Sequence, residues 1–116
     1  MTVSTTEIAN RALTRIGVKT FDNAVDDAVI AQVKSSLDDL YNLLFALEIV
    51  SWDLDSIPDK SVGSMVSELA WHIRDDFSIP DNKKMSLMNA QRQARADLQS
   101  LEEVPDNGEP TVINAY

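Results

Sequence analysis

Apolar residues recur at alternating spacings of three and four positions in four separate stretches of this chain. That spacing places the apolar side chains of each stretch on one face of an α-helix. The clearest stripe consists of Ile30, Val33, Leu37, Leu40, Leu44 and Leu47. Gly17, Pro58 and Pro80 separate the stretches, and no strand pattern of useful length occurs before residue 111. The sequence therefore predicts an all-α fold, a small four-helix bundle.

Capping residues set the expected start of the first two helices. Ser4 and Glu7 have the spacing of a capping box, and Gly17 suits the position after a helix end, so the first helix is expected over about residues 5–16. Asp26 or Asp27 caps the second helix. The apolar stripe of this helix widens near its end through Tyr41, Leu43 and Phe45. The widening predicts that neighbouring elements cover this half on more than one side.

The third helix is expected to begin near Asp59 as its N-cap, and Asp81 is a candidate cap for the fourth. The apolar face of the third helix consists of Val62, Val66, Leu69, Ile73 and Phe77. Trp52 lies between the second and third helices, where we expect it to anchor the loop. Trp71 points away from the main stripe of its helix, so it packs on another helix or faces a neighbouring subunit.

The last residues of the chain differ from everything before them. Pro105 ends the fourth helical pattern, which divides the chain into a helical domain at 1–104 and an extended C-terminal arm at 105–116. The tip of the arm is apolar, and its candidate docking residues are Val112, Ile113 and Tyr116. Such a segment folds back on its own domain, binds another chain as an extended peptide, or frays as chain ends often do. Its composition favours a docking arm.

The composition limits the classes of function. The chain has 116 residues and a net charge of −9, which argues against sequence-specific nucleic-acid binding because such binding needs a basic surface. The absence of cysteine excludes disulfides and thiolate metal sites. No stretch approaches the ~18 apolar residues that a membrane span needs, and the first residues do not resemble a signal peptide. We therefore expect a soluble protein of intracellular origin.

Catalytic motifs are not evident. His72 is the single histidine, and with Asp76 it makes an i, i+4 pair that would share one helix face. Two ligands make a weak metal site, so a surface hydrogen bond is the expected role of this pair. The three glycines are isolated, which excludes a glycine-rich phosphate loop, and few aromatic residues are present to line a sugar-binding cleft. We expect no enzyme activity, no cofactor and no metal.

The order of these features resembles a known family. The opening segment Ile8–Gly17 contains the motif Ala12-Leu13-Thr14-Arg15-Ile16-Gly17, and an acidic helix later ends before Trp52. Further on, Leu69-Ala70-Trp71-His72-Ile73 leads into the alanine- and arginine-bearing segment Met88–Leu101. In this order and spacing, over roughly residues 6–103, the sequence is similar to the head-tail adaptors of tailed bacteriophages. In short-tailed phages these proteins are called tail accessory factors or tail tubular protein A-like proteins.

The resemblance implies a structural role in the virion. Members of that family are helical and assemble as a ring, typically a dodecamer, beneath the portal protein. The ring extends the DNA channel, helps to retain the genome and carries tail proteins of the nozzle or tube. By this analogy the chain would be made in the host cytoplasm and reside at the portal vertex. DNA would pass through the lumen without specific binding, and Val112, Ile113 and Tyr116 would dock on the portal or on an adjacent subunit.

One alternative comes from the charge. A small acidic helical protein can bind a basic host or phage protein by presenting carboxylates in place of phosphates, as a DNA-mimic type inhibitor does. That reading predicts a monomer or dimer that binds tightly to a basic protein. The adaptor reading predicts a ring subunit that binds a portal.

Overall fold

The computed structural model of the chain describes residues 3–18 and 25–103. Four α-helices make up most of the described chain, and two 3-10 turns interrupt the connections. In chain order these are α1 (Thr5–Arg15), α2 (Asp27–Ala46), η1 (Leu54–Ser56), α3 (Asp59–His72), η2 (Arg74–Asp76) and α4 (Asp81–Glu103). The described residues contain no strand, so the predicted all-α, four-helix fold is confirmed.

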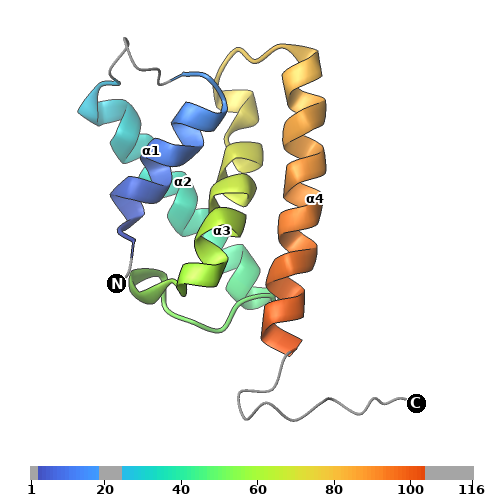
Figure 1. Cartoon of the computed structure of the whole chain (residues 1–116). Helices are drawn as coiled ribbons and strands as arrows, with labels where there is room; N and C mark the ends of the chain where they lie inside the picture. The colour runs from blue at the N-terminus through green and yellow to red at the C-terminus, as the bar shows by residue number, and fades with distance from the viewer. Residues whose placement is uncertain (1–2, 19–24, 104–116) are drawn as a thin grey trace.

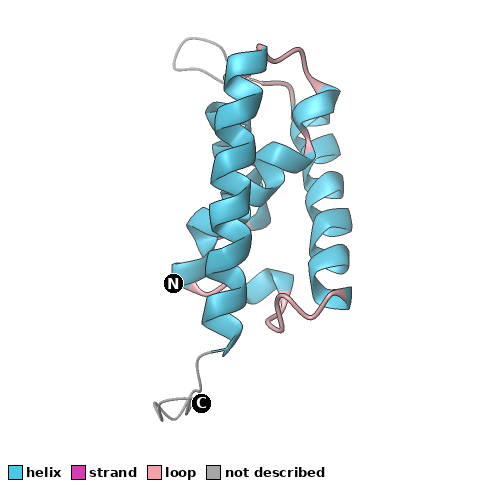
Figure 2. Cartoon of the chain, turned by 90° about the vertical axis from the view of Figure 1, so that its right-hand side faces the viewer, coloured by secondary structure: helices cyan, strands magenta, loops and turns pink. Residues whose placement is uncertain are grey.

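Helix α3 lies at the centre of the molecule and packs against each of the other three helices. In Figure 1, α1, α3 and α4 stand side by side toward the viewer, and α2 crosses behind α1 and α3. In Figure 2, which is turned by 90°, α4 lies in front, nearest the viewer. The molecule therefore has a three-helix side and an α2 side.

The central position of α3 explains its burial. Met65, Leu69 and Ala70 on α3 are fully buried, as are Leu37 and Leu44 on α2. Helix α1 contributes Ile8, Ala9, Ala12 and Leu13, and α4 contributes Leu87, Ala94 and Leu98. All of these side chains except Ala94 belong to one contiguous apolar core.

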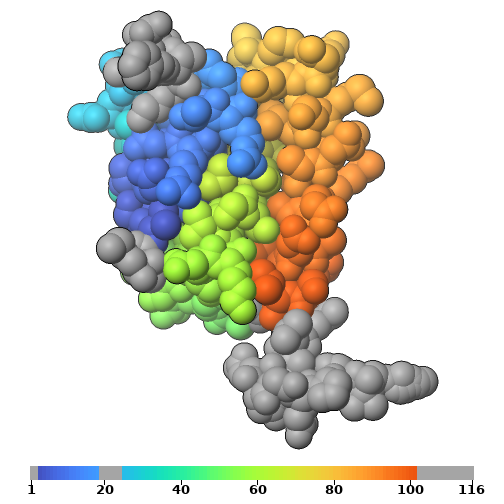
Figure 3. Space-filling model, in the orientation of Figure 1, coloured from blue at the N-terminus to red at the C-terminus, as the bar shows by residue number. Residues whose placement is uncertain are grey.

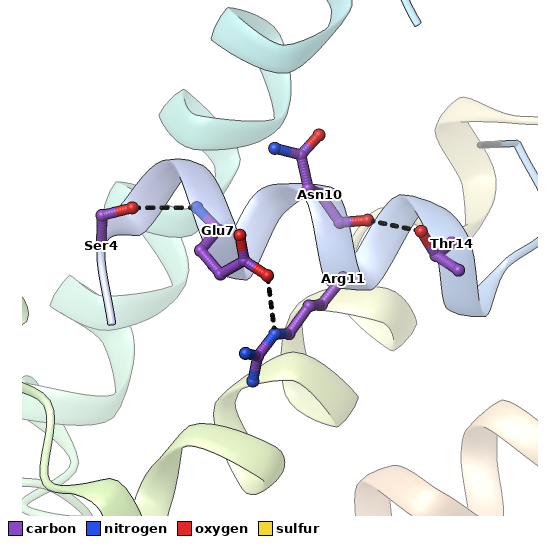
Figure 4. A network of polar contacts seen from close by, with 5 residues as sticks. All are labelled: Ser4, Glu7, Asn10, Arg11 and Thr14. Carbon is purple, nitrogen blue, oxygen red and sulfur yellow. Dashed lines mark hydrogen bonds and ion pairs between the residues drawn. The ribbon is translucent and has the colours of Figure 1, made fainter. Parts of the chain in front are cut away.

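The capping box at the start of α1 is half formed. The backbone N–H of Glu7 donates to Ser4 Oγ at 3.1 Å, as expected, but the Glu7 carboxylate pairs with Arg11 Nε at 2.9 Å. Figure 4 shows both contacts along the exposed side of α1. At the other end of α1, Gly17 has φ +87°, a left-handed conformation that glycine adopts without steric cost. The helix thus ends where the glycine predicted.

The predicted cover over the end of α2 is wrong. Val33, Leu37, Leu40 and Leu44 are buried as the stripe predicts. Leu47, however, is 54% exposed, and the flanking Leu43 and Phe45 are 47% and 51% exposed. The physical reason is that α2 lies on one side of the molecule, where only α1 and α3 contact it substantially. The residues by which the stripe widens at the end of α2 therefore face solvent in part.

The third helix is shorter than its apolar pattern suggests. It begins at Asp59 with Pro58 as N-cap and ends at His72, and η2 then turns the chain toward Phe77. Ile73 still reaches the core as the C-cap residue. Because the helix stops at His72, the expected i, i+4 relation between His72 and Asp76 does not exist. Within the described part of the chain, no hydrogen bond joins these two residues.

Candidate functional site

The predicted docking residues Val112, Ile113 and Tyr116 lie outside the described residues, and so does the whole predicted arm at 105–116. The described helices lie within the predicted helical domain at 1–104, and the last of them ends at Glu103. Candidate surfaces are therefore sought on the helical domain itself.

Two grooves mark the three-helix side. One lies between α1 and α3 and has a volume of about 410 Å³, and the other lies between α3 and α4 with about 340 Å³. Gly63 on α3 lines both. We call this side the groove face; its lining includes Arg11, Arg15, Val66, Lys60 and Ala94. Figure 3 views this side, with α3 in yellow-green between α1 in blue and α4 in orange.

Gly63 leaves space where the two grooves meet. A Cβ atom built on this residue would find no atom within 4 Å, and Gly63 is exposed. A glycine inside a helix costs about 1 kcal/mol relative to alanine. Nothing within the described chain requires glycine here. An incoming side chain or helix can approach the α3 backbone closely at this point.

The groove between α1 and α3 carries cations on one wall. Arg11 is half exposed and pairs with Glu7 along α1. Arg15 reaches across to α3, where its guanidinium donates to the hydroxyl of Ser67. That contact joins two helices that are far apart in sequence. The only sign of this contact in the sequence is the position of Arg15 near the end of the first helix.

Glu68 is the centre of a buried polar cluster between α3 and α4. It is 1% exposed, and Arg95 donates from Nε to Oε2 at 2.6 Å and from Nη2 to Oε1 at 3.1 Å. Gln91 adds a third bond, from Nε2 to Oε1 at 3.1 Å. The hydrogen bond to Glu68 is the main cause that raises the pKa of the Arg95 guanidinium. With both carboxylate oxygens occupied and no access to solvent, Glu68 is suited to holding α4 on α3 and not to acid–base chemistry.

The α2 side of the molecule is strongly acidic. Residues 26–58 contain one lysine and seven acidic residues, a net charge of −6. All seven are exposed: Asp26, Asp27, Asp38, Asp39, Glu48, Asp53 and Asp55. Residues 3–18 and 59–103 contain eight basic and nine acidic residues, a net charge of −1. We call the surface of α2 and its following connection the acidic face.

Within the acidic face, the C-terminal end of α2 exposes three large apolar side chains. Leu43, Phe45 and Leu47 expose about half of their surface within little more than one helical turn. The neighbouring Tyr41 donates from its hydroxyl to the carbonyl oxygen of Trp52 at 2.7 Å, which agrees with the expected anchoring of that loop. Burial, and secondarily the charge of Asp53, raises the pKa of Tyr41. Leu43 and Leu47 are one helical turn apart on one flank of α2, and Phe45 lies on the opposite flank. Exposed large apolar side chains of this kind are typical of interaction surfaces.

The remaining candidates from the sequence make no site. His72 is exposed at the end of α3, and Arg74 stacks over the ring of Trp71 at 3.6 Å from its centroid. Trp71 is half-buried against the core of its own chain. Among the described residues, no group of three or more His, Cys, Asp or Glu side chains is placed to hold a metal ion. None of the described helices is long and apolar enough to cross a membrane.

Comparisons of the chain with models of protein families, with curated proteins and with solved structures find no match.

Proposed function

We propose that this chain is a structural head-to-tail adaptor of a tailed bacteriophage. Its copies form a ring under the portal, extend the DNA channel and carry the tail proteins of the nozzle or tube. In this proposal the chain acts in the virion at the portal vertex, without a cofactor or enzyme activity, and the ring is a dodecamer as in the family that it resembles.

The observation that carries the proposal is the agreement between the resemblance and the fold. The resemblance covers roughly residues 6–103, and this range folds as a four-helix domain. The first motif of the resemblance forms the C-terminal end of α1. Its residues Leu13 and Ile16 are buried, and Gly17 has a positive φ. Trp52 follows the end of α2, and α4 carries the alanine- and arginine-bearing segment. The residues that carry the resemblance thus lie in the helices, and at the helix ends and connections, of one helical domain.

The charge of the domain supports passage of DNA without binding. DNA binding requires cations that displace the counterions of the phosphates. The chain carries a net charge of −9, so its copies offer few contacts to phosphates, and DNA can slide past them. The proposal assigns the docking role to Val112, Ile113 and Tyr116, which bind the portal or an adjacent subunit.

The test is capture of the chain by the portal protein that the same phage genome encodes. The full chain should bind the purified portal, and a chain that ends at Pro105 should bind it much more weakly, with an almost unchanged melting temperature. A triple serine variant of Val112, Ile113 and Tyr116 should behave like the truncated chain. Serine at Thr111 and Asn114 is the matched control and should bind normally. Failure of the full chain to bind the portal would contradict the adaptor proposal.

The acidic face also favours a second candidate function, binding to a basic protein as a DNA mimic. Seven exposed carboxylates on α2 and its connection are the kind of surface that such binding needs. If this function holds, a basic DNA-binding protein retains the chain, added duplex DNA releases it, and the portal does not capture it.

A further inference from the structure

We propose that the groove face binds the acidic face of a second copy of this chain, with the apolar end of α2 seated in the grooves beside Gly63. Copies joined in this way associate head to tail. The inference deepens the proposed ring, since it names the two surfaces that meet in it, but the argument uses only the domain itself.

Shape is the first argument. Leu43, Phe45 and Leu47 are apolar side chains that need a hollow in order to leave water. The groove face offers two such hollows on either side of α3, and Gly63 opens the ridge between them. The walls include apolar atoms of Val66 and Ala94. Leu43 and Leu47 lie on one flank of the α2 end and Phe45 on the other, and the two grooves lie on the two sides of α3.

Charge is the second argument, and it selects the occupant. Asp38 and Asp39 lie one helical turn before the apolar end of α2. The charged residues that line the grooves are Arg11, Arg15 and Lys60 together with Glu7 and Asp97, a net charge of +1. A net charge of −6 over residues 26–58 disfavours contact between two acidic faces, since like charges repel across an interface. Contact between an acidic face and a groove face avoids this repulsion and sets Asp38 and Asp39 against a surface with a small positive charge.

The symmetry of the contact follows. Two different surfaces of the same chain make a heterologous interface, which closes into a ring when the rotation between copies permits and otherwise extends as a filament. The acidic face and the groove face lie on the α2 side and the three-helix side of the molecule, so one copy can engage two neighbours (Figure 1). An interface that pairs identical patches would stop at a dimer.

The experiment uses the absence of native cysteine. Leu47→Cys labels the acidic face and Gly63→Cys labels the groove face; both positions are exposed, and the space at Gly63 accepts a side chain. The two full-length variants are mixed at high concentration with a short bismaleimide cross-linker. We expect a heterodimer, and several-fold less homodimer from either variant alone. In the control mixture, Met85→Cys replaces Leu47→Cys. Met85 is an exposed residue of α4, and this mixture should give only background cross-linking.

Two further readouts keep the result decisive. Adding Asp38→Lys and Asp39→Lys to the Leu47→Cys variant should reduce the heterodimer several-fold, and so should molar salt, because opposite charges assist the contact. Sedimentation of the unlabelled chain should show association that Leu43→Lys weakens. Equal cross-linking in the control mixture, strong homodimers of one variant, or a chain that stays monomeric at every concentration would overturn the inference.

The outcome separates from that of the proposed function, because no portal is present in this experiment. Cross-linking without portal capture would support the head-to-tail contact and contradict the adaptor proposal. Portal capture without cross-linking would support the adaptor proposal and contradict this interface.

Discussion

Glu68 and Arg95 show how single residues join the two helices that pack most extensively in this fold. A carboxylate that is 1% exposed has lost its hydration, and the three hydrogen bonds from Arg95 and Gln91 replace it. Arg95 is less buried, with 30% of its side chain exposed. The two partners are therefore unequal: removal of the arginine leaves a buried charge, while removal of the glutamate leaves an arginine that can turn toward water.

We predict that Arg95→Ala destabilises the domain by about 3–5 kcal/mol, as expected when a buried carboxylate loses its partner. Glu68→Leu should cost less, because it removes the buried charge itself. Urea unfolding followed by circular dichroism measures both. Arg92→Ala is the matched control, since Arg92 is exposed on the same helix, and it should stay within about 0.5 kcal/mol of the unchanged chain. Equal losses for Arg95→Ala and Arg92→Ala would show that the cluster is not stabilising.

The cluster also shows what sequence reasoning at this scale misses. Glu68 could be identified only as one carboxylate among many, because its partners lie 23 and 27 residues away on another helix. The position of Glu68 beside Leu69 on α3 gives a weak signal, since a charge next to the apolar stripe needs a partner when it is buried. Short-range signals were read more accurately: Ser4 and Gly17 act at the ends of α1 as predicted.

At the scale of the elements, α2 has two kinds of leucine side by side. Leu44 is fully buried and Leu43 is 47% exposed. We predict that Leu44→Ala costs about 2–5 kcal/mol of folding free energy, as core leucines do. Leu43→Ala should cost about 1 kcal/mol or less, because it removes a partly solvated side chain. Thermal or urea unfolding of the two variants tests which face of α2 is buried; equal costs would mean that the face is assigned wrongly.

Helix α3 permits an opposite change. Gly63→Ala should stabilise the domain by about 0.5–1 kcal/mol, since the new Cβ finds open space and alanine favours the helix. The chain retains a glycine that its own fold does not need. If Gly63→Ala instead destabilises the isolated domain, α3 has a local requirement for glycine, and the space above Gly63 cannot be attributed to a contact between copies.

Helix number, order and most boundaries could be predicted because each depends on local patterns and caps. The errors concern what covers a helix. The wide stripe at the end of α2 was interpreted as a sign of more neighbours, yet Leu43, Phe45 and Leu47 are exposed, because one apolar pattern fits both a buried face and an interaction surface. The pairing of His72 with Asp76 failed since α3 ends at His72. The grooves beside Gly63 arise from helix packing and have no signature in the sequence.

At the scale of the whole molecule, the described chain has unequal sides, with net charges of −6 over residues 26–58 and −1 over residues 3–18 and 59–103. In the proposed ring, this inequality would give each subunit a direction. The proposed contact between copies and the proposed docking of Val112, Ile113 and Tyr116 would have separate tasks. The first would close the ring, and the second would attach it to the portal or to the next subunit.

The most direct test of the adaptor proposal is an image reconstruction of the purified portal after incubation with the full chain. We expect a ring of copies coaxial with the portal, its channel continuous with the portal channel, and the four helices of each copy fitting the density. A portal without added density, or with the chain bound off the axis and leaving the channel unextended, would contradict the adaptor proposal.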